Sequence, residues 1–262
     1  MKIVTWNING VRARIDNLIA WLNESRPDIV CLQEIKTVDE GFPRAEIEAL
    51  GYNVETHGQK GFNGVAILSK LPFDEVSRGL PGDDGDEQAR FIEGVFSTGD
   101  GALRVVSLYL PNGNPIGTEK FSYKLAWMER LEAWAKARLD LEEPLVLAGD
   151  YNVIPEKEDA KRWQDWVNDA LFQPESRQAF RRLGNLGYTE AVRSTTDDPG
   201  VYTFWDYQAG AWQKNNGIRI DHLMLSPEAA NRLQSASVEK HVRAWEKPSD
   251  HVPVAIELRF AA

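Results

Sequence analysis

Acidic and amide side chains stand at the ends of apolar, strand-like runs of this 262-residue chain. Glu34 ends one such run, and Gly149, Asp150 and Asn152 follow the run of residues 145–148. A residue at the end of a strand can be held rigidly and still be exposed, as a catalytic group must be. Asp and Asn are poor strand formers, so their position beside a β-rich run needs another reason. Gly149 before them is consistent with a close approach of two backbones.

Three further places carry polar groups of the same kind. Asn7 ends the first apolar run, Asp221 interrupts the run of residues 220–225, and Asp250 with His251 opens the last run. A buried carboxylate without a partner is costly, so we expect Asp221 to contact another polar side chain. Each position taken alone also fits a turn, a solvated loop or a structural histidine. The interpretation therefore rests on the whole set.

Elements that could position these residues are visible in the hydrophobic pattern. Helical spacing of apolar residues predicts helices that contain residues 15–22, 121–135 and 179–186. Because helices alternate with strands, and several strands follow one another closely, we expect α/β layers with mixed sheets. Residues 81–87 are typical of a surface loop, and no stretch resembles a linker, so we expect one domain over residues 1–262. The runs of strand length are residues 3–8, 29–32, 65–68, 91–96, 103–110, 145–148, 220–225 and 254–260.

The composition is that of a globular protein, with 42% hydrophobic and 27% charged residues. A formal net charge of −10 is opposite to that of a broadly basic surface, so any patch that guides a polyanion must be local. The single cysteine, Cys31, excludes an internal disulfide and lies in an apolar run, where we expect a buried thiol. The chain has no apolar stretch near the roughly 20 residues that span a bilayer, and no secretory signal. We expect a cytoplasmic protein without membrane contact.

Taken together and in this order, the motifs resemble the bacterial exonuclease III family of abasic-site endonucleases, within the DNase-I-like group of endonucleases, exonucleases and phosphatases. The resemblance extends over essentially the whole chain, from residues 2–10 to residues 247–251, and includes residues 57–61, 64–69, 109–113 and 202–207. It implies a four-layered α/β sandwich, in which two mixed β-sheets pack face to face and helices flank them. It also implies a magnesium-dependent phosphodiesterase.

The resemblance implies a role for each polar residue. Glu34 is expected to be the principal Mg²⁺ ligand, with Asn7 close to it and Asp250 as a candidate second ligand; Mn²⁺ is expected to substitute. Magnesium prefers such oxygen ligands and takes only one or two carboxylates from a protein. Asn152 resembles the amide that hydrogen-bonds the scissile phosphate, and Tyr109 the phenol that contacts it.

The general base is open between two residues. Asp150 is expected to orient or deprotonate the attacking water, while His251 is either the base or a cation bonded to a phosphoryl oxygen. Asp221 would accept a hydrogen bond from the other ring nitrogen and fix the tautomer. Because Asp221 would favour the imidazolium, Asp150 is the preferred base.

Apolar residues near the end of the chain resemble a pocket that accepts a bare deoxyribose and excludes a base: Phe204, Trp212, Ile218 and Ile220. Damage can be selected partly because a nucleotide without a base costs less to extrude from the stack. Basic side chains in or beside the matching segments are candidates for contacts with the DNA backbone: Arg12, Lys36, Lys60, Arg90, Lys120 and Lys124.

The resemblance implies a DNA repair nuclease that cuts the phosphodiester 5′ to abasic sites, with 3′-5′ exonuclease and 3′-phosphatase or phosphodiesterase activity on double-stranded DNA. The expected partner is double-stranded DNA with abasic sites or blocked 3′ ends, and the chain is expected to be a monomer. Two alternatives stay open: a same-fold phosphatase acting on another phosphate ester, and a catalytically silent nucleic-acid-binding regulator. Residues 156–178 are expected to influence the balance of activities.

Overall fold

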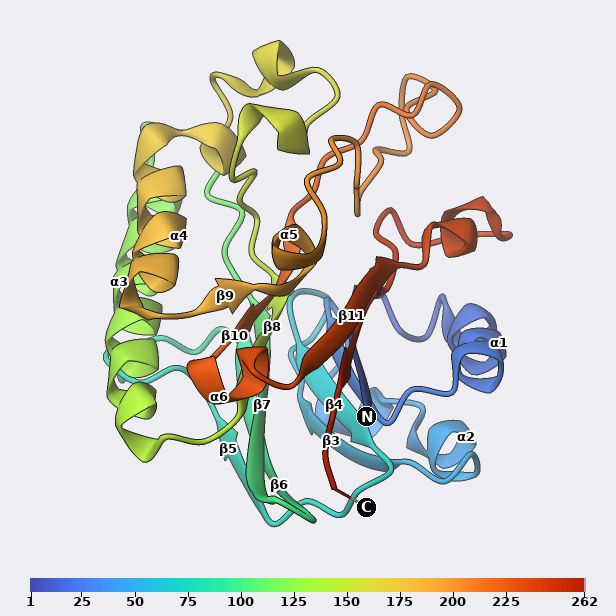
Figure 1. Ribbon diagram of the computed structural model, residues 1–262. Coiled ribbons are helices and arrows are strands. Elements are labelled where there is room, and N and C mark those ends of the chain that lie inside the picture. Colours follow the sequence, from blue (N-terminus) through green and yellow to red (C-terminus); the bar gives the residue numbers. More distant parts are fainter. Residues whose placement is uncertain (262) are drawn as a thin grey trace.

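The computed structural model describes residues 1–261 and, within them, forms two six-stranded mixed sheets that pack face to face (Figure 1). The first sheet has the order β11 (Leu233–Val238), β12 (Val254–Leu258), β1 (Lys2–Asn7), β2 (Ile29–Gln33), β4 (Val65–Ser69) and β3 (Asn53–His57). The second has the order β5 (Glu75–Arg78), β6 (Phe91–Thr98), β7 (Gly101–Tyr109), β8 (Leu145–Asp150), β10 (Asp221–Leu225) and β9 (Thr189–Glu190).

Helices cover the outer face of each sheet, which completes four layers (Figure 1). The helices α1 (Ile15–Ser25) and α2 (Arg44–Glu48) lie on the first sheet, and α3 (Glu119–Arg138) and α4 (Pro174–Leu186) lie on the second. Two short helices, α5 (Ala191–Thr195) and α6 (Pro227–Ala230), lie beside β10. The expected four-layered α/β sandwich is confirmed. Of the helices described in residues 1–261, none has the length and apolar character that a membrane crossing requires.

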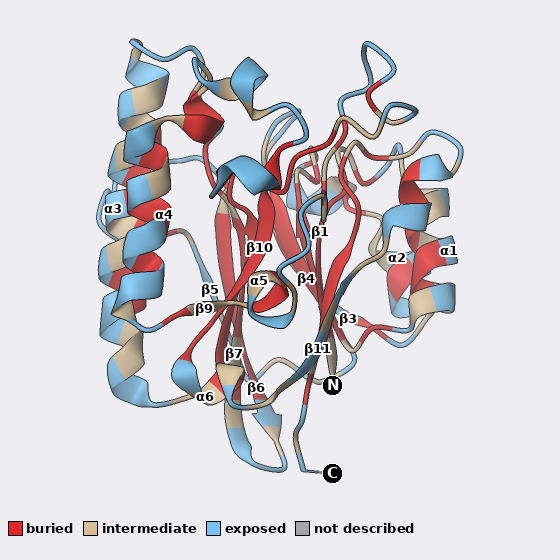
Figure 2. Cartoon of the chain, turned by 45° about the horizontal axis from the view of Figure 1, so that its top comes forward, coloured by how far each residue is buried: buried red, intermediate tan, exposed pale blue. Residues whose placement is uncertain are grey.

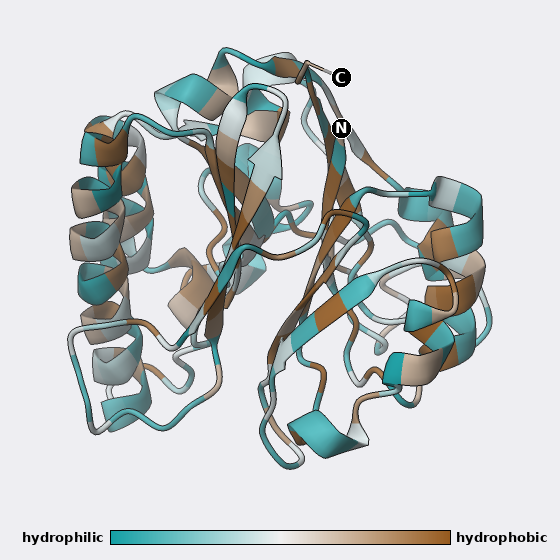
Figure 3. Cartoon of the chain, turned by 90° about the horizontal axis from the view of Figure 1, so that it is seen from below, coloured by the Kyte–Doolittle hydropathy of each residue, from teal (hydrophilic) through white to brown (hydrophobic). Residues whose placement is uncertain are grey.

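The core consists of one apolar layer between the sheets and one beneath each pair of helices. Along β8, Val146 and Ala148 face the other sheet, whereas Leu145 and Leu147 pack beneath α3 and α4. This alternation follows from the period of two in a strand. In Figure 2 the strands are mainly buried and the outer faces of the helices are exposed, and in Figure 3 the strands are mainly hydrophobic. Cys31 lies in the layer between the sheets and is fully buried, as expected.

All eight predicted runs form strands, and the three predicted helices form α1, α3 and α4. The strands that the pattern did not indicate are β3, β5, β9 and β11. All four are edge strands: β11 and β3 end the first sheet, and β5 and β9 end the second. Edge strands such as β5 are largely exposed, so their sequences need few apolar residues and give a weak signal.

Candidate active site

Strand directions in the second sheet bring three of the predicted residues to one edge. Strands β7 and β8 are parallel, so their carboxyl ends meet, and Tyr109 pairs with Asp150. Strand β10 is antiparallel to β8, so its first residue lies at the same edge, and Asp221 pairs with Asp150. The same period-two alternation that turns Val146 and Ala148 inward turns Asp150 toward the first sheet.

The first sheet supplies the other side chains by the same rule. Strands β1 and β2 are parallel, so Asn7 ends beside Gln33, directly before Glu34. Strand β12 is antiparallel to β1, so His251, just before it, reaches the same edge. The Ser249 hydroxyl donates to the Asn7 carbonyl oxygen (2.6 Å) and accepts from the His251 amide (3.2 Å), which fixes this segment on β1.

An amide joins the two sheets at the centre of the site. The Asn7 Nδ2 group donates to Glu34 Oε1 and to Asp150 Oδ2, each at 2.9 Å. The Asn7 side-chain oxygen accepts from the Asn9 amide at 3.0 Å, which fixes the orientation of the Asn7 side chain. Glu34 has a φ of 49°, in the left-handed region that non-glycine residues rarely adopt. Such strain persists only where neighbouring contacts impose it, and it concentrates at functional sites.

A histidine lies between two carboxylates on the other side of the site. His251 Nδ1 donates to Asp221 Oδ2 at 2.8 Å, and its Nε2 lies 3.5 Å from Asp150 Oδ2. Burial disfavours the charged ring, but the carboxylates of Asp221 and Asp150 outweigh it and hold the pKa of His251 well above its usual value. Asp221 therefore has the partner that its buried position required. The imidazolium is the favoured form of His251.

Burial and negative neighbours also change Asp150 and Tyr109. Burial, together with the charges of Asp221 and Glu34, raises the pKa of Asp150 against the opposing effect of His251. Burial, together with the charges of Glu34 and Asp150, raises the pKa of Tyr109 well above its usual value. Tyr109 is thus a neutral phenol that can donate a hydrogen bond at the edge of the site.

The donor set fits a divalent cation. Ligand atoms of Glu34, Asp150 and His251 all lie within 4.8 Å of one another. Because His251 is bonded to Asp221 and favours its charged form, the carboxylate oxygens of Glu34 and Asp150 are the better donors, and hard cations prefer oxygen. Asp250 is partly buried beside them, and burial raises its pKa. It remains a candidate second ligand.

Asn152 and Arg90 flank this centre. Asn152 has a φ of 48°, its amide donates to Asp150 Oδ1 (3.0 Å), and its Nδ2 donates to the Leu110 carbonyl (2.7 Å). The Arg90 guanidinium lies 4.9 Å from the centre of the Tyr109 ring, and its Nη1 donates to the Tyr109 carbonyl at 3.1 Å. Both residues therefore lie within the site. Lys60 is exposed on the loop that follows β3.

A small cavity lies near His251, on the other side of the Phe204 ring. Phe204 and Ile218 line this space of about 260 Å³, together with polar and acidic residues, and the Phe204 ring centre is 5.0 Å from that of His251. Ile220 is 2% exposed and packs behind this wall. Trp212 is not among the lining residues, and its ring packs edge-on against Trp205 at 4.9 Å. Of the four residues expected to form the sugar pocket, Phe204 and Ile218 line this cavity, Ile220 packs behind them, and Trp212 does not line it, so the pocket assignment stays a prediction.

The prediction that Lys124 contacts the DNA backbone is wrong. Its side chain is 0% exposed and donates to the carbonyl oxygens of Asn112 (3.1 Å) and Asn152 (2.5 Å). Of the other basic candidates, Arg12, Lys60 and Lys120 are exposed, and Arg90 and Lys36 are partly exposed.

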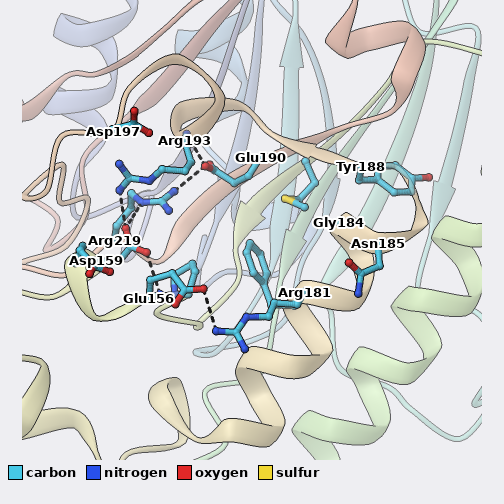
Figure 4. Close-up of a pocket in the computed structure, with 14 residues that line it drawn as sticks. Glu156, Asp159, Arg181, Gly184, Asn185, Tyr188, Glu190, Arg193, Asp197 and Arg219 are labelled. Atoms are coloured by element: carbon cyan, nitrogen blue, oxygen red, sulfur yellow. Dashed lines mark hydrogen bonds and ion pairs between the residues drawn. The ribbon is translucent and has the colours of Figure 1, made fainter.

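A buried cluster of ion pairs lies behind the cavity wall and was not predicted from the sequence. Arg219 is 2% exposed, its Nε donates to Asp159 Oδ1 at 2.8 Å, and its Nη1 lies 2.9 Å from Glu190 Oε2. Arg193 also bonds to Asp159 Oδ1, at 2.8 Å (Figure 4). The cluster borders a second cavity of about 470 Å³ and ties residues 217–221 to the loop before η4 (Trp163–Trp166). The sequence did contain a signal for this cluster, because the charged Arg219 stands between two isoleucines.

The fold and this site define a class of phosphoester-hydrolysing sandwich proteins. Residues 4–251 match the Endonuclease/Exonuclease/phosphatase family, and the chain belongs to it. It is 36% identical over 270 residues to "Exodeoxyribonuclease III" of Haemophilus influenzae (99% of this chain, 100% of that protein) and 32% identical over 261 residues to "Exodeoxyribonuclease" of Bacillus subtilis (98% of each).

Solved structures agree with this assignment. The "3'-5' exonuclease (NExo)" from Neisseria meningitidis superposes with a TM-score of 0.94 at 35% identity, covering 98% of this chain and 99% of that one. An AP endonuclease from Archaeoglobus fulgidus superposes with a TM-score of 0.93 at 36% identity, with the same coverage. The expected membership of the exonuclease III group is confirmed.

Proposed function

We propose that this protein is a DNA repair nuclease that hydrolyses the phosphodiester 5′ to abasic sites in double-stranded DNA, with Mg²⁺ as its cofactor and Mn²⁺ as a substitute. We further propose 3′-5′ exonuclease and 3′-phosphatase activity at blocked 3′ ends. The observation that carries the proposal is the convergence of Glu34, Asp150 and His251, with ligand atoms within 4.8 Å of one another, beside the cavity that Phe204 and Ile218 line. Relatives whose names are those of exonucleases and AP endonucleases support it.

The side chains divide the chemistry between them. A bound divalent cation, held by Glu34 with Asp150 and Asp250 as further carboxylates while the Asn7 amide orients Glu34, would supply positive charge where negative charge grows on the phosphoryl oxygens. Asp150 has a raised pKa, which suits a group that orients water and accepts its proton. His251 is fixed by Asp221 and donates from Nε2 to a phosphoryl oxygen.

Two further residues complete phosphate binding. Tyr109 keeps its proton because burial and Glu34 raise its pKa, so its hydroxyl donates to the phosphate. Asn152 presents its side-chain amide at the end of β8, directly beyond Asp150. Neutral donors placed before the reaction begins stabilise charge that develops in the transition state.

The small cavity provides selectivity. Its volume of about 260 Å³ and its apolar wall suit an extruded sugar that carries no base. Extruding an abasic nucleotide from the base stack also costs less free energy, so both the fit to the cavity and the ease of extrusion favour its binding. Arg90 and Lys120, which line a separate cavity beyond the end of β7, provide contacts to backbone phosphates that do not depend on sequence.

The test compares a duplex that carries one abasic analogue with a matched undamaged duplex, each incubated with Mg²⁺ and with a chelator. A Mg²⁺-dependent nick on the 5′ side of the lesion, with release of phosphate from a 3′-phosphate end, is the expected result. Equal inertness toward both duplexes with hydrolysis of a phosphoinositide would assign the chain to another phosphate ester. Binding of DNA without hydrolysis in any metal would assign it to the silent regulators.

A further inference from the structure

Lys124 on α3 is a buried ammonium group whose partners are neutral. Its side chain is fully buried, and within residues 1–261 it makes no ion pair. Its Nζ donates to the carbonyl oxygens of Asn112 and Asn152, and burial lowers its pKa to about 7. Lysine is almost never fully buried without a paired charge, because desolvation of the ammonium is costly. The cost of burying this ammonium group must therefore be offset by an interaction that an apolar side chain could not make.

The two carbonyls belong to the loops that leave the catalytic strands. Asn112 follows Tyr109 at the end of β7, and Asn152 follows Asp150 at the end of β8. Lys124 thus joins the two loop segments from the side of α3. Together with the contacts that Leu110 makes with Asp150 and Asn152, this side chain fixes the distance between the two loops.

The loop after β7 is shaped to lie on this lysine. Gly113 has a φ of 87°, and a Cβ at this position would stand 2.5 Å from Lys124 Cδ. Asn152 has a φ of 48°, so its backbone also adopts the left-handed conformation that needs support from its surroundings. Contacts from Lys124 Nζ and from the Leu110 carbonyl hold Asn152 at both its main chain and its side chain.

Packing alone does not account for the residue. The neighbouring buried positions of α3 are apolar, namely Trp127, Met128 and Leu131, and they pack beneath the second sheet. A methionine at position 124 would fill a similar volume without the cost of desolvating an ammonium. The hydrogen bonds of the head group are what distinguishes lysine here.

We propose that Lys124 is a positioning residue for phosphate hydrolysis: by holding the carbonyls of Asn112 and Asn152, it aims the Asn152 side-chain amide at the phosphate. The inference rests on the proposed nuclease function and deepens it. Lys124 acts through Asn152 and touches no substrate. A displacement of about 1 Å in a positioned group can reduce the rate about 100-fold.

The first experiment compares Lys124→Met with a matched control, Leu131→Ala, on the abasic duplex with Mg²⁺. For Lys124→Met we expect kcat to fall roughly 10- to 100-fold, with KM and the Mg²⁺ dependence changed less than about threefold. Leu131→Ala removes buried volume from the same helix, so it should lower Tm and leave kcat unchanged. Wild-type kcat in folded Lys124→Met would overturn the inference.

A double-mutant cycle separates positioning from general support. In the Asn152→Ala background, Lys124→Met should change kcat less than about threefold, because the group it positions is gone. A full multiplicative loss in that background would overturn the inference. In Gly113→Ala, the new Cβ presses on the Lys124 side chain from the loop. This variant should lower kcat in the wild-type background and have little effect in the Asn152→Ala background, with the core intact. An inactive wild-type protein would overturn the nuclease proposal itself, whereas an active wild type beside an equally active Lys124→Met would overturn only the role of Lys124.

Discussion

Replacing Gly149 by alanine tests how tightly the site depends on the spacing of β7 and β8. Gly149 pairs with Leu108 in this parallel pair and directly precedes Asp150. A Cβ at Gly149 would stand 2.1 Å from the Leu108 carbonyl oxygen and 2.9 Å from its carbon. The close backbone approach that the sequence suggested is confirmed. Because the nearest contacted atom is a backbone oxygen, no side-chain rotation relieves the clash.

The size of the effect follows from this distance. Ordinary van der Waals contact begins near 3.4 Å, so the two strands must separate by roughly 1 Å. Overpacking of this kind typically costs 1–3 kcal/mol, and a central sheet position belongs at the upper end, about 3 kcal/mol. The shift also moves Asp150 relative to Tyr109, so we expect kcat to fall about 100-fold.

The assay pairs urea unfolding, followed by tryptophan fluorescence, with the rate of nicking of an abasic duplex. The control is Gly184→Ala in α4, where a Cβ meets nothing within 4 Å. Alanine is a better helix former than glycine by about 1 kcal/mol or less, so this variant should be slightly more stable and equally active. A Gly149→Ala protein with wild-type stability and rate would refute the reasoning.

Three further predictions concern the cation, the core and the buried ions. Glu34→Ala should lower kcat roughly 10²- to 10³-fold with an unchanged circular dichroism spectrum, and near-normal turnover would remove Glu34 from the site. Cys31 is fully buried, and burial raises its thiol pKa, so a thiol reagent should react only after denaturation; prompt reaction with the native protein would contradict this burial. Burial opposes the charged form of Glu190, but Arg219 outweighs it and lowers the pKa from 4.5 to about 2, so its stabilisation is present above pH 5 and lost toward pH 2. Glu190→Gln should therefore flatten the fall in unfolding free energy over this range by on the order of 3 kcal/mol, and parallel curves for the two proteins would argue against it.

The hydrophobic pattern and the family resemblance together predicted the layers of the fold and most residues now seen at one edge of the sheets. Lys124 shows where that reasoning stopped. A basic side chain beside a matching segment was interpreted as a surface contact. The helical spacing would have predicted that Lys124 is buried, because it lies on the same helical face as Met128, Leu131 and Ala135, all of which are buried. Sequence periodicity assigns a residue to a face, but which polar atoms that face meets depends on loops from elsewhere in the chain.

Trp212 shows a different limit. The family resemblance placed Trp212 with Phe204 in one pocket, whereas in the structure the Trp212 ring lies against Trp205, Lys240 and Arg243. No local pattern determines the direction of the loop that carries Trp212. The edge strand β11 was missed for a related reason, because its half-exposed side chains lack a clear alternation.

The pairing of β1 with β12 has a consequence for synthesis of the protein. Asn7 and Glu34 leave the ribosome early, but His251 and the strand that seats it beside β1 come among the last residues described. A nascent chain therefore holds its acidic groups long before it holds the imidazolium that faces Asp150. If the proposed mechanism holds, a chain without β12 lacks the strand that seats His251 beside β1, and we expect it to be inactive.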